Sequence, residues 1–321
     1  MRKLFAALIA ATCVVSASAA AQENWPQRQV TIVVPFAPGG SADLIARILQ
    51  QQMQARFGIP FVVENKSGAG GSIGAGYAAK APADEYTLLI GTASTQAINP
   101  FLYKRLPFDV ERDFQAITLL VRFPNLLFVS KRVPATSVPQ FIEYLKANDG
   151  KMNFGSSGIG TSSHLSSVMF QLATHTRMIH VPFRSTAEVV NSMLGGSIEV
   201  AMESMTTTWP FAVSGEVRAL AVTTPQRSAT APDLPTIGET LKDYEATAWQ
   251  GLFAPAGTPS PIIERIAAEV KRIWDLPAVA TALRNVGGEP ATSSPDEFKQ
   301  YNRAERARWG GVVKAAGAQI D

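Results

Sequence analysis

Cysteine is the residue type that this sequence most conspicuously lacks. Among its 321 residues the only cysteine is Cys13, which lies inside an apolar run, residues 4–15. Two basic residues precede the run and small residues follow it, which is the pattern of a secretory signal peptide with cleavage after Ala19 or Ala21. We expect residues 1–21 to be removed. The mature chain then has no cysteine, which excludes disulfides, thiol catalysis and cysteine-ligated metals.

Long hydrophobic runs are also missing. The apolar run near the N-terminus has twelve residues, too few to span roughly 30 Å of hydrocarbon, which argues against a membrane anchor. Thr12 and Val14 flank Cys13 and argue against lipid attachment there. No later segment is apolar enough to span a membrane. An exported chain without cysteine suits the oxidising periplasm, where we expect it to reside.

Charge of one sign is not concentrated anywhere in the chain. The 29 basic residues are nearly balanced by 26 acidic ones, and two of the basic residues belong to the expected leader. Nucleic-acid binding requires clustered Lys and Arg, so we expect no nucleic-acid partner. Oligomer state cannot be read from these patterns, and a monomer is the default expectation.

Metal and cofactor signatures are absent from the sequence. The three histidines, His164, His175 and His180, have no metal-ligand spacing and no H-E-x-x-H motif. The glycine-rich turn at residues 39–41 has no lysine of a Walker loop, and in residues 68–74 an isoleucine replaces the third glycine of a dinucleotide fingerprint. We therefore expect no cofactor and no metal.

What the sequence does contain is an alternation of short β-rich runs and helical patterns, which predicts parallel α/β sheets with both faces covered. The chain is long enough for two medium domains and has no linker, so we expect it to cross between domains through strands. The expected strands are residues 30–34, 61–63, 87–90, 126–129, 152–154, 179–181, 198–202 and 219–222. The expected helices are residues 41–57, 137–147, 163–173, 187–194, 208–213, 261–274 and 296–313, and residues 254–259 are expected to form a surface loop.

A glycine-rich turn follows the first expected strand and leads directly into a helix. Residues 33–43 read V-V-P-F-A-P-G-G-S-A-D. Free N–H groups and the helix dipole attract anions at such a helix start. Gly39 and Gly40 permit a sharp turn, and Ser41 can cap the helix. An ordinary strand-to-helix turn explains the pattern equally well.

Two further glycine-rich turns lie later in the chain. Residues 68–74 are expected to be a loop that bends near a pocket. Residues 155–164, G-S-S-G-I-G-T-S-S-H, crowd hydroxyls and N–H groups together and form a candidate anion cradle. Ser157 and His164 could alternatively be the nucleophile and base of an exported hydrolase. The G-x-S-x-G elbow fails because Ile159 replaces its second glycine, and no acid stands out to orient the histidine.

Two other segments follow strands and carry ligand-type side chains. Arg184 could bind a carboxylate as a fork or be a solvated surface cation, and both readings stay open. The hydroxyls of residues 205–210 could cap a helix or contact a ligand. In open α/β sheets ligands bind at the carboxyl ends of strands, so the early and middle clusters predict two domains that face each other across a cleft. No acid/base pair accompanies them, which favours capture over catalysis.

In their order along the chain, several segments resemble the periplasmic substrate-binding receptors of tripartite tricarboxylate transporters, the Bordetella-uptake-gene type. The matching segments are residues 30–43, 62–71, 86–89, 99–100, 155–165, 180–183, 218–223, 234–236 and 254–259. The resemblance implies a two-lobed, type II periplasmic-binding-protein-like fold, a Venus flytrap of two Rossmann-like α/β domains with crossing strands. Domain 1 would comprise residues 22–122 and 236–321, and domain 2 residues 123–235.

The resemblance also implies a receptor that is not an enzyme. Such a receptor captures a small organic carboxylate and delivers it to membrane transporter subunits, or in some relatives presents it to a sensor. The ligand would be held by the turns at residues 36–43 and 155–161, with residues 92–94 lining the same cleft. The candidate ligand-binding residues are Phe36, Ala37, Pro38, Gly39, Gly40, Ser41, Asp43, Thr92, Ser94, Gly155, Ser156, Ser157, Thr161, His164, Arg184, Ser185 and Ser204.

Two segments depart from the pattern of this family. Residues 83–85 are A-D-E where many relatives have P-D-G, which alters a turn. Residues 183–185 are F-R-S where many relatives have Y-K-G, which places a stronger carboxylate fork or a surface cation near the cleft mouth. Ser204 lies at a variable position. These differences leave the choice of carboxylate open.

Overall fold

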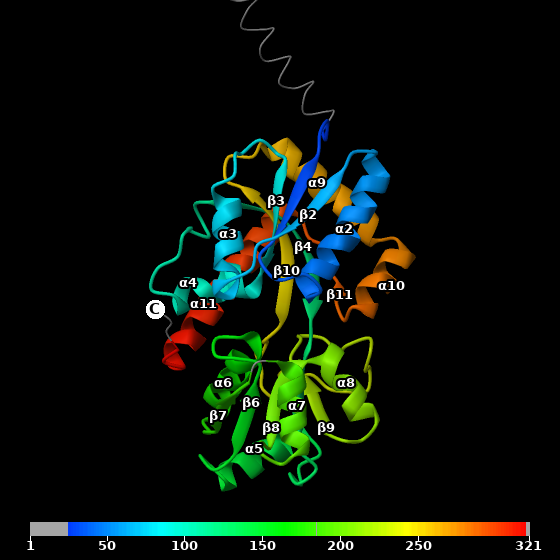
Figure 1. Ribbon diagram of the computed structural model, residues 1–321. Helices are drawn as coiled ribbons and strands as arrows, with labels where there is room; N and C mark the ends of the chain where they lie inside the picture. The colour runs from blue at the N-terminus through cyan, green and yellow to red at the C-terminus, as the bar shows by residue number, and fades with distance from the viewer. Residues whose placement is uncertain (1–24, 184, 319–321) are drawn as a thin grey trace, which may run out of the picture.

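The computed structural model describes residues 25–183 and 185–318; the expected signal peptide, residues 1–21, and Arg184 lie outside the described residues. Two sheets form two α/β lobes that are joined by extended strands, as expected (Figure 1). The upper lobe has the strand order β11-β4-β10-β3-β1-β2, and the lower lobe has the order β7-β6-β8-β5-β9.

The strands of each lobe have the following bounds. The upper sheet contains β1 (Val30–Val34), β2 (Phe61–Asn65), β3 (Thr87–Thr92), β4 (Phe114–Phe123), β10 (Ala248–Pro255) and β11 (Glu289–Pro290). The lower sheet contains β5 (Asn125–Val129), β6 (Asn153–Ser156), β7 (Ile179–Pro182), β8 (Val200–Ser204) and β9 (Arg218–Val222).

Both sheets are mixed, which corrects the expectation of parallel sheets. β1 pairs in parallel with β2 and β3, but β10 is antiparallel to both β3 and β4. In the lower sheet β6 is parallel to β7 and β8, whereas β5 is antiparallel to β8 and β9. The reason lies in the crossings: β4 leads the chain down into the lower lobe and β10 brings it back, so the two strands run in opposite directions.

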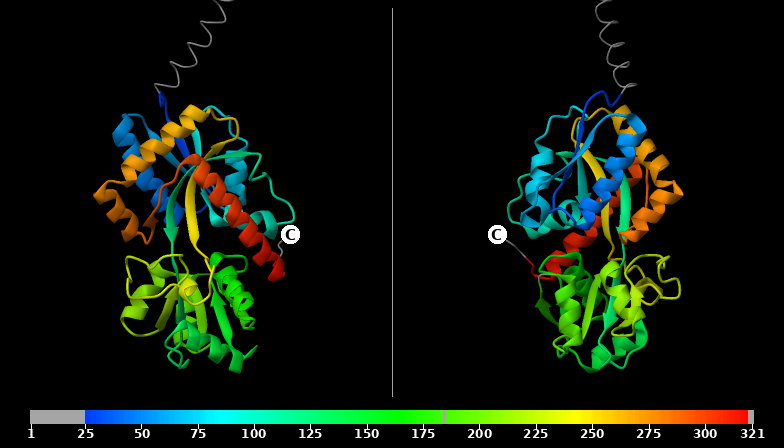
Figure 2. Two further views of the ribbon diagram at one scale, coloured as in Figure 1. Left: turned by 180° about the vertical axis from the view of Figure 1, so that it is seen from behind. Right: turned by 45° about the vertical axis from the view of Figure 1, so that its right-hand side comes forward.

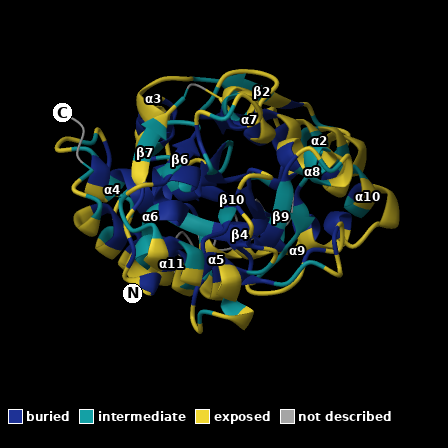
Figure 3. Ribbon diagram, turned by 90° about the horizontal axis from the view of Figure 1, so that it is seen from below, coloured by how far each residue is buried: buried dark blue, intermediate teal, exposed yellow. Residues whose placement is uncertain are grey.

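Helices cover both faces of each sheet, and seen from below the central strands are largely buried, whereas the edge strand β7 and the outer faces of the helices are exposed (Figure 3). The upper lobe contains α2 (Ser41–Phe57), α3 (Ser72–Ala79), α4 (Asn99–Leu102), α9 (Ser260–Trp274), α10 (Pro277–Asn285) and α11 (Pro295–Ala315), with short turns η1 (Ala69–Gly71) and η2 (Ser94–Ile98). The lower lobe contains α5 (Val138–Ala147), α6 (Ser162–Thr174), α7 (Thr186–Leu194) and α8 (Met205–Val213), and η3 (Ile237–Glu239) follows β9.

The period of two along the strands sorts side chains into separate cores. Ile32 and Leu88 face the core beneath α2, α9 and α10, whereas Val33 and Leu89 face the core beneath α3, α4 and α11. The second of these cores continues into the lower lobe, where it covers the sheet face under α5 and α6. The opposite face of the lower sheet has its own core against α7 and α8. The lobes therefore share one continuous hydrophobic layer.

Two segments expected to be loops contain regular structure. Residues 68–74 form η1 and the start of α3, because the glycines let the helix lie directly on its neighbours. A Cβ on Gly74 would lie 2.6 Å from the Cα of Pro35 and 2.6 Å from the carbonyl oxygen of Lys66. Residues 254 and 255 complete β10 and are buried, so the expected surface loop begins only after them.

The chain crosses between the lobes after β4 and again before β10, and helix α11 adds a packing contact between them (Figure 2). The segment after β9 returns along the lower sheet: Val222 bridges to Thr236, and the hydroxyl of Tyr244 donates to the carbonyl of Ser166 at 2.9 Å. We therefore propose that the lower lobe extends to about residue 246, beyond the sequence-predicted crossing at 235/236. The C-terminal helix α11 also packs against α6 of the lower lobe.

Candidate functional site

A cavity of about 490 Å³ lies between the lobes at the carboxyl ends of the central strands. Its lining comes from the β1–α2 turn, the end of β3 and the crossing strand β10 in the upper lobe. The lower lobe contributes the turns after β6, β7 and β8. Nine Ser and Thr residues give this cavity a polar but largely uncharged wall, namely Ser41, Thr92, Ser94, Ser157, Ser162, Thr186, Ser204, Thr206 and Thr207.

The upper wall presents the start of α2. Gly40 precedes the helix in an extended conformation, φ −79° and ψ 169°, and no side chain accepts a hydrogen bond from the first turn. Gly40, Ser41 and Ala42 all line the cavity. The first N–H groups of an α-helix have no partner within the helix and carry the positive end of its dipole. This wall can therefore bind an anion through main-chain groups.

Asp43 does not line the cavity; its side chain instead hydrogen-bonds groups of the β1–α2 turn and its neighbours. Its Oδ2 accepts the N–H of Gly39 at 2.9 Å and the Nε–H of Arg47 at 2.8 Å, and its Oδ1 accepts from Asn65 at 3.0 Å. Burial alone would raise the pKa of Asp43, but the hydrogen bonds from these three residues hold it below its ordinary value. These hydrogen bonds hold the turn in shape through groups of the protein itself.

A carboxylate of the protein itself occupies the lower anion cradle. Glu203 lies near the end of β8 and is buried, and its Oε1 accepts the N–H of Ser157 at 2.6 Å. Its Oε2 accepts the hydroxyl of Thr186 at 2.7 Å. Burial raises the pKa of Glu203 despite the hydrogen bonds that it accepts from Thr186, Ser163 and Ser157. The available signal for it was an acid inside the apolar run V-A-M-E-S, which the sequence analysis missed.

The helix start that stays open in the lower lobe belongs to α8. Ser204 precedes this helix and does not cap it with its side chain. The N–H of Met205 donates to the carbonyl of Pro124 at 3.0 Å, and the next two residues, Thr206 and Thr207, line the cavity. Each lobe therefore offers one helix N-terminus without a side-chain cap to the same cavity. Among the described lining residues there is no Lys, Arg or His, and Glu203 is the only ionisable side chain.

The crossing strand β10 supplies the side wall of the cavity. Trp249 lines it and donates its indole N–H to Glu305 of α11 at 2.9 Å. Gln250 also lines it and donates its Nε2–H to the Ser41 hydroxyl oxygen at 3.0 Å. Sequence analysis found neither residue, because β10 was not among the expected strands.

The predicted site residues divide into those at the cavity and those behind it. Lining the cavity are Phe36, Gly40, Ser41, Thr92, Ser94, Ser157 and Ser204. Outside the lining lie Ala37, Pro38, Gly39, Asp43, Gly155, Ser156, Thr161, His164 and Ser185. Arg184 lies outside the described residues. The predicted turns therefore converge on one cavity, although only part of each turn reaches its surface.

The geometry does not assemble the alternative pair of Ser157 and His164. Nδ1 of His164 accepts the N–H of Gly160 at 3.2 Å, and its ring stacks on that of His180 with centroids 4.1 Å apart. The Ser157 hydroxyl bonds to that of Ser163 at 3.2 Å. Burial, together with the neighbouring His180, lowers the pKa of His164 to about 4. His164 therefore packs and hydrogen-bonds as a neutral structural group at neutral pH.

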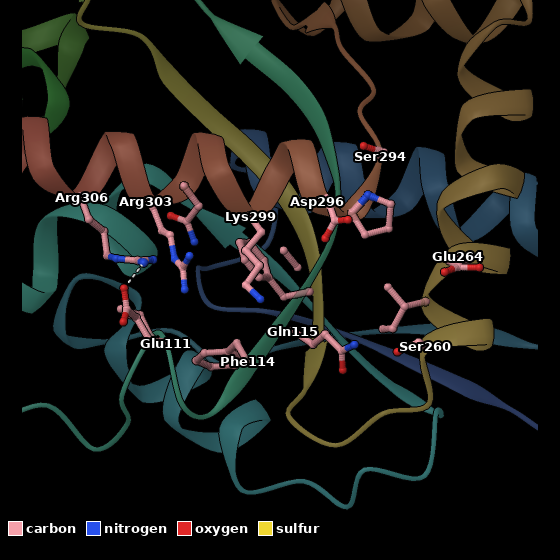
Figure 4. Close-up of a pocket in the computed structure, with 16 residues that line it drawn as sticks. Glu111, Phe114, Gln115, Ser260, Glu264, Ser294, Asp296, Lys299, Arg303 and Arg306 are labelled. Carbon is pink, nitrogen blue, oxygen red and sulfur yellow. Dashed lines mark hydrogen bonds and ion pairs between the residues drawn. The ribbon is translucent and has the colours of Figure 1, made fainter.

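A second pocket of about 460 Å³ lies between α9 and α11 and shares no lining residue with the cleft (Figure 4). Lys299, Arg303 and Arg306 extend into it from α11, and Arg306 pairs with Glu111. Its lining also includes the acids Glu264 and Asp296.

Within the described part of the chain, no group of three or more His, Cys, Asp or Glu side chains could hold a metal ion. None of the described helices combines the length and apolar character needed to cross a bilayer.

Comparison with known proteins gives consistent matches over nearly the whole chain. The model of the tripartite tricarboxylate transporter family receptor matches residues 45–318. The chain is 32% identical to protein BugT of Bordetella pertussis, over 93% of this chain and 92% of BugT. Among solved structures, R. palustris Rpa4515 with adipate aligns at 36% identity and a TM-score of 0.77, over 92% of this chain and all of that one. MatC from Rhodopseudomonas palustris with bound malate aligns at 31% identity and a TM-score of 0.72, over 90% of this chain and all of that one.

Proposed function

Because this chain belongs to the tripartite tricarboxylate transporter receptor family, we propose that it is a periplasmic solute-binding receptor for a small organic carboxylate. The observation that carries the proposal is the pair of helix starts, α2 and α8, that face one interlobe cavity without side-chain caps. Two related structures hold the dicarboxylates adipate and malate. The ligand is bound between the lobes and released unchanged.

The energetics permit such binding without a basic side chain. Each charge-assisted hydrogen bond from an N–H or hydroxyl contributes about 1.5–3 kcal/mol, and each helix end adds about 0.3–2 kcal/mol. A micromolar dissociation constant corresponds to roughly −8 kcal/mol. Two helix starts and the surrounding hydroxyls reach this value, and closure of the lobes strengthens every bond by excluding water. Because closure moves the lobes, we expect a more compact form with ligand.

The location and partner follow from the N-terminal pattern and the family. The apolar run at residues 4–15 with its small-residue flank directs export, and the mature receptor acts in the periplasm as a monomer. There it delivers its ligand to the membrane subunits of a tripartite tricarboxylate-type transporter.

The test is a thermal-shift screen of the mature protein, residues 22–321, against mono-, di-, tri- and aromatic carboxylates, each paired with its uncharged amide. We expect at least one acid to raise Tm while its amide does not, with micromolar affinity by calorimetry. Small-angle scattering should show a smaller radius of gyration with that acid. Absence of any shift across the acids, or conversion of the bound acid into a product, would overturn the proposal.

A further inference from the structure

Gly287 ends helix α10 and lies where the two lobes touch beside the cleft. Its φ is +78°, and its N–H donates to the carbonyl of Arg284 at 2.8 Å. The N–H of Gly288 donates to the carbonyl of Leu283 at 2.9 Å. These two bonds are the pair of a Schellman motif, which ends a helix on a left-handed glycine. The turn that carries Gly287 therefore has a defined shape.

This turn rests on the first turn of α8 in the opposite lobe. A Cβ added to Gly287 would lie 1.5 Å from Oγ1, 2.6 Å from Cβ and 2.7 Å from Cγ2 of Thr206. Rotation about χ1 moves Oγ1 and Cγ2 but leaves the Cβ of Thr206 in place. Only a movement of the backbone makes room for a side chain at residue 287. The lobes therefore approach this closely because that residue is glycine.

Thr206 belongs to the helix start that we propose binds the ligand. It is the second residue of α8 and lines the cleft, as does Val286, the neighbour of Gly287. The N–H of Met205 donates to the carbonyl of Pro124, which lies in the crossing between β4 and β5. The start of α8 is thus held between the crossing chain and the end of α10.

The contact bears on the separation of the two helix starts. The start of α2 belongs to the upper lobe, as does Gly287, and the start of α8 belongs to the lower lobe. Because close-packed protein interiors hardly compress, a contact between the lobes limits how near they come to each other. The gap that remains fixes how far apart two anionic groups of one ligand must be to reach both helix starts.

We propose that Gly287 is a positioning residue that sets the separation of the α2 and α8 starts, and with it the length of the dicarboxylate that the cleft accepts. A methyl group at residue 287 pushes on Thr206 and holds the lobes further apart. Short diacids then no longer reach both helix starts, whereas longer ones do. This inference rests on the proposed function of the cleft, and it concerns which acid binds rather than whether one binds.

The test is calorimetry with a series of straight-chain dicarboxylates from malonate to pimelate. The wild-type protein should bind one length best. Gly287→Ala should bind that acid at least about tenfold more weakly, because overpacking a close contact is costly, and its own preferred acid should be longer by at least one methylene group.

The matched control is Gly58→Ala at the end of α2. Gly58 also ends its helix in the left-handed region, with a φ of +68°, so the methyl group brings the same kind of backbone strain. No atom of the described residues lies within 4 Å of a Cβ added there. Gly58→Ala should therefore keep both the affinity and the preferred length of the wild type.

A second background shows whether the effect passes through Thr206. Thr206→Gly removes all three atoms that the methyl group meets, so adding Gly287→Ala to it should change affinity by less than about threefold. That rescue supports the inference even where the single variant Gly287→Ala binds no acid.

Three results would overturn the inference while the receptor function stands. They are a wild-type protein that binds carboxylates without preference for one diacid length, a preferred length unchanged in Gly287→Ala or equally shifted in Gly58→Ala, and an undiminished loss of affinity in the Thr206→Gly background. Only failure of every carboxylate to bind the wild-type protein removes both.

Discussion

The interlobe cleft and the pocket between α9 and α11 are almost equal in size but differ in the number of charged side chains that line them. The cleft, of about 490 Å³, has one ionisable residue in its described lining, the acid Glu203. The other pocket, of about 460 Å³, has three acids and three cations, namely Glu111, Glu264, Asp296, Lys299, Arg303 and Arg306. Yet the cleft is the region where both lobes, the strand ends and two helix starts converge. The basic side chains of the second pocket therefore lie outside the cleft in which we propose that the anion binds.

The difference arises from which polar groups are already satisfied. In the cleft the carboxylates of Asp43 and Glu203 accept the N–H groups of Gly39 and Ser157, which shapes the turns, and no side chain caps the starts of α2 and α8. In the other pocket Arg306 is paired with Glu111, and Lys299 and Arg303 are exposed to water. Water and salt screen most of the attraction between a solvated cation and an anionic ligand. Main-chain N–H groups in an enclosed cleft are screened less and attract the same ligand more strongly.

The largest expected effect comes from removing one main-chain donor of the cleft. Ser41→Pro deletes the first N–H of α2, and proline is well tolerated at this first helical position after an extended residue. We expect affinity for the ligand to fall about 10- to 100-fold, because one charge-assisted hydrogen bond is lost. Calorimetry checks this against Ser41→Ala, which keeps the N–H. Equal affinities of the two variants would contradict the main-chain model.

A smaller effect is expected from the one acid of the cleft. Burial raises the pKa of Glu203, so the fold favours its protonated form. Its contribution to stability is present below the ordinary pKa of 4.5 and is lost as pH rises through the raised value. Ionised Glu203 also repels an anionic ligand, so affinity should fall about three- to tenfold across the same rise in pH.

Glu203→Gln should flatten that pH profile of affinity. The matched control is Glu264→Gln, an exposed acid of the other pocket, which should keep the wild-type profile. Calorimetry with the same ligand across the pH series makes the comparison. A wild-type affinity that is independent of pH would show that the charge of Glu203 does not affect ligand binding.

The pocket between α9 and α11 offers a test of stability rather than of binding. Asn302 is buried there with its Oδ1 unpartnered. Replacing such an amide by an apolar group of similar shape is neutral or stabilising, so Asn302→Leu should raise the free energy of unfolding by up to about 1 kcal/mol. Urea denaturation measures this, and Asn302→Ala, which leaves a void, should lower it. A marked loss in Asn302→Leu would indicate that the amide has a partner in solution.

The smallest expected effect belongs to the cations of the same pocket. The double substitution Lys299→Gln and Arg303→Gln removes two exposed positive charges that lie outside the cleft. Ligand affinity should change by less than about twofold, since salt screens exposed charges over a Debye length of about 8–10 Å and these two residues do not line the cleft. A loss of tenfold or more in calorimetry would relocate the ligand to the cationic pocket.

Local signals made the first strand and helix predictable. The bounds of β1 and α2 agree with the expected residues 30–34 and 41–57, because Gly40 precedes the helix and Gly58 ends it with a φ of +68°. In contrast, β10 was missed, since its sequence A-W-Q-G-L-F-A-P contains a glycine and ends in proline, which weakens a strand pattern. Gly251 is required there by tertiary contact, because a Cβ would lie 2.1 Å from the ring of Phe298.

The candidate site was predictable only as a set of turns. The pattern of glycines and hydroxyls located the turns after β1 and β6, and both border the cleft. Asp43 and Glu203 each accept one N–H group of these turns, so they determine which N–H groups stay free. Glu203 and its partner Ser157 lie 46 positions apart in the chain. Such a pairing has no local signature. The same holds for Gln250, which meets Ser41 from 209 positions away.

The C-terminal helix has a consequence for motion. α11 is anchored to the upper lobe through Glu305, which accepts the indole N–H of Trp249 on β10, while its far end lies on α6 of the lower lobe. Rotation of the lobes must therefore slide or part the α6–α11 seam, far from the mouth of the cleft. A spectroscopic probe pair across that seam would report opening and closing from the back of the molecule, without touching the ligand.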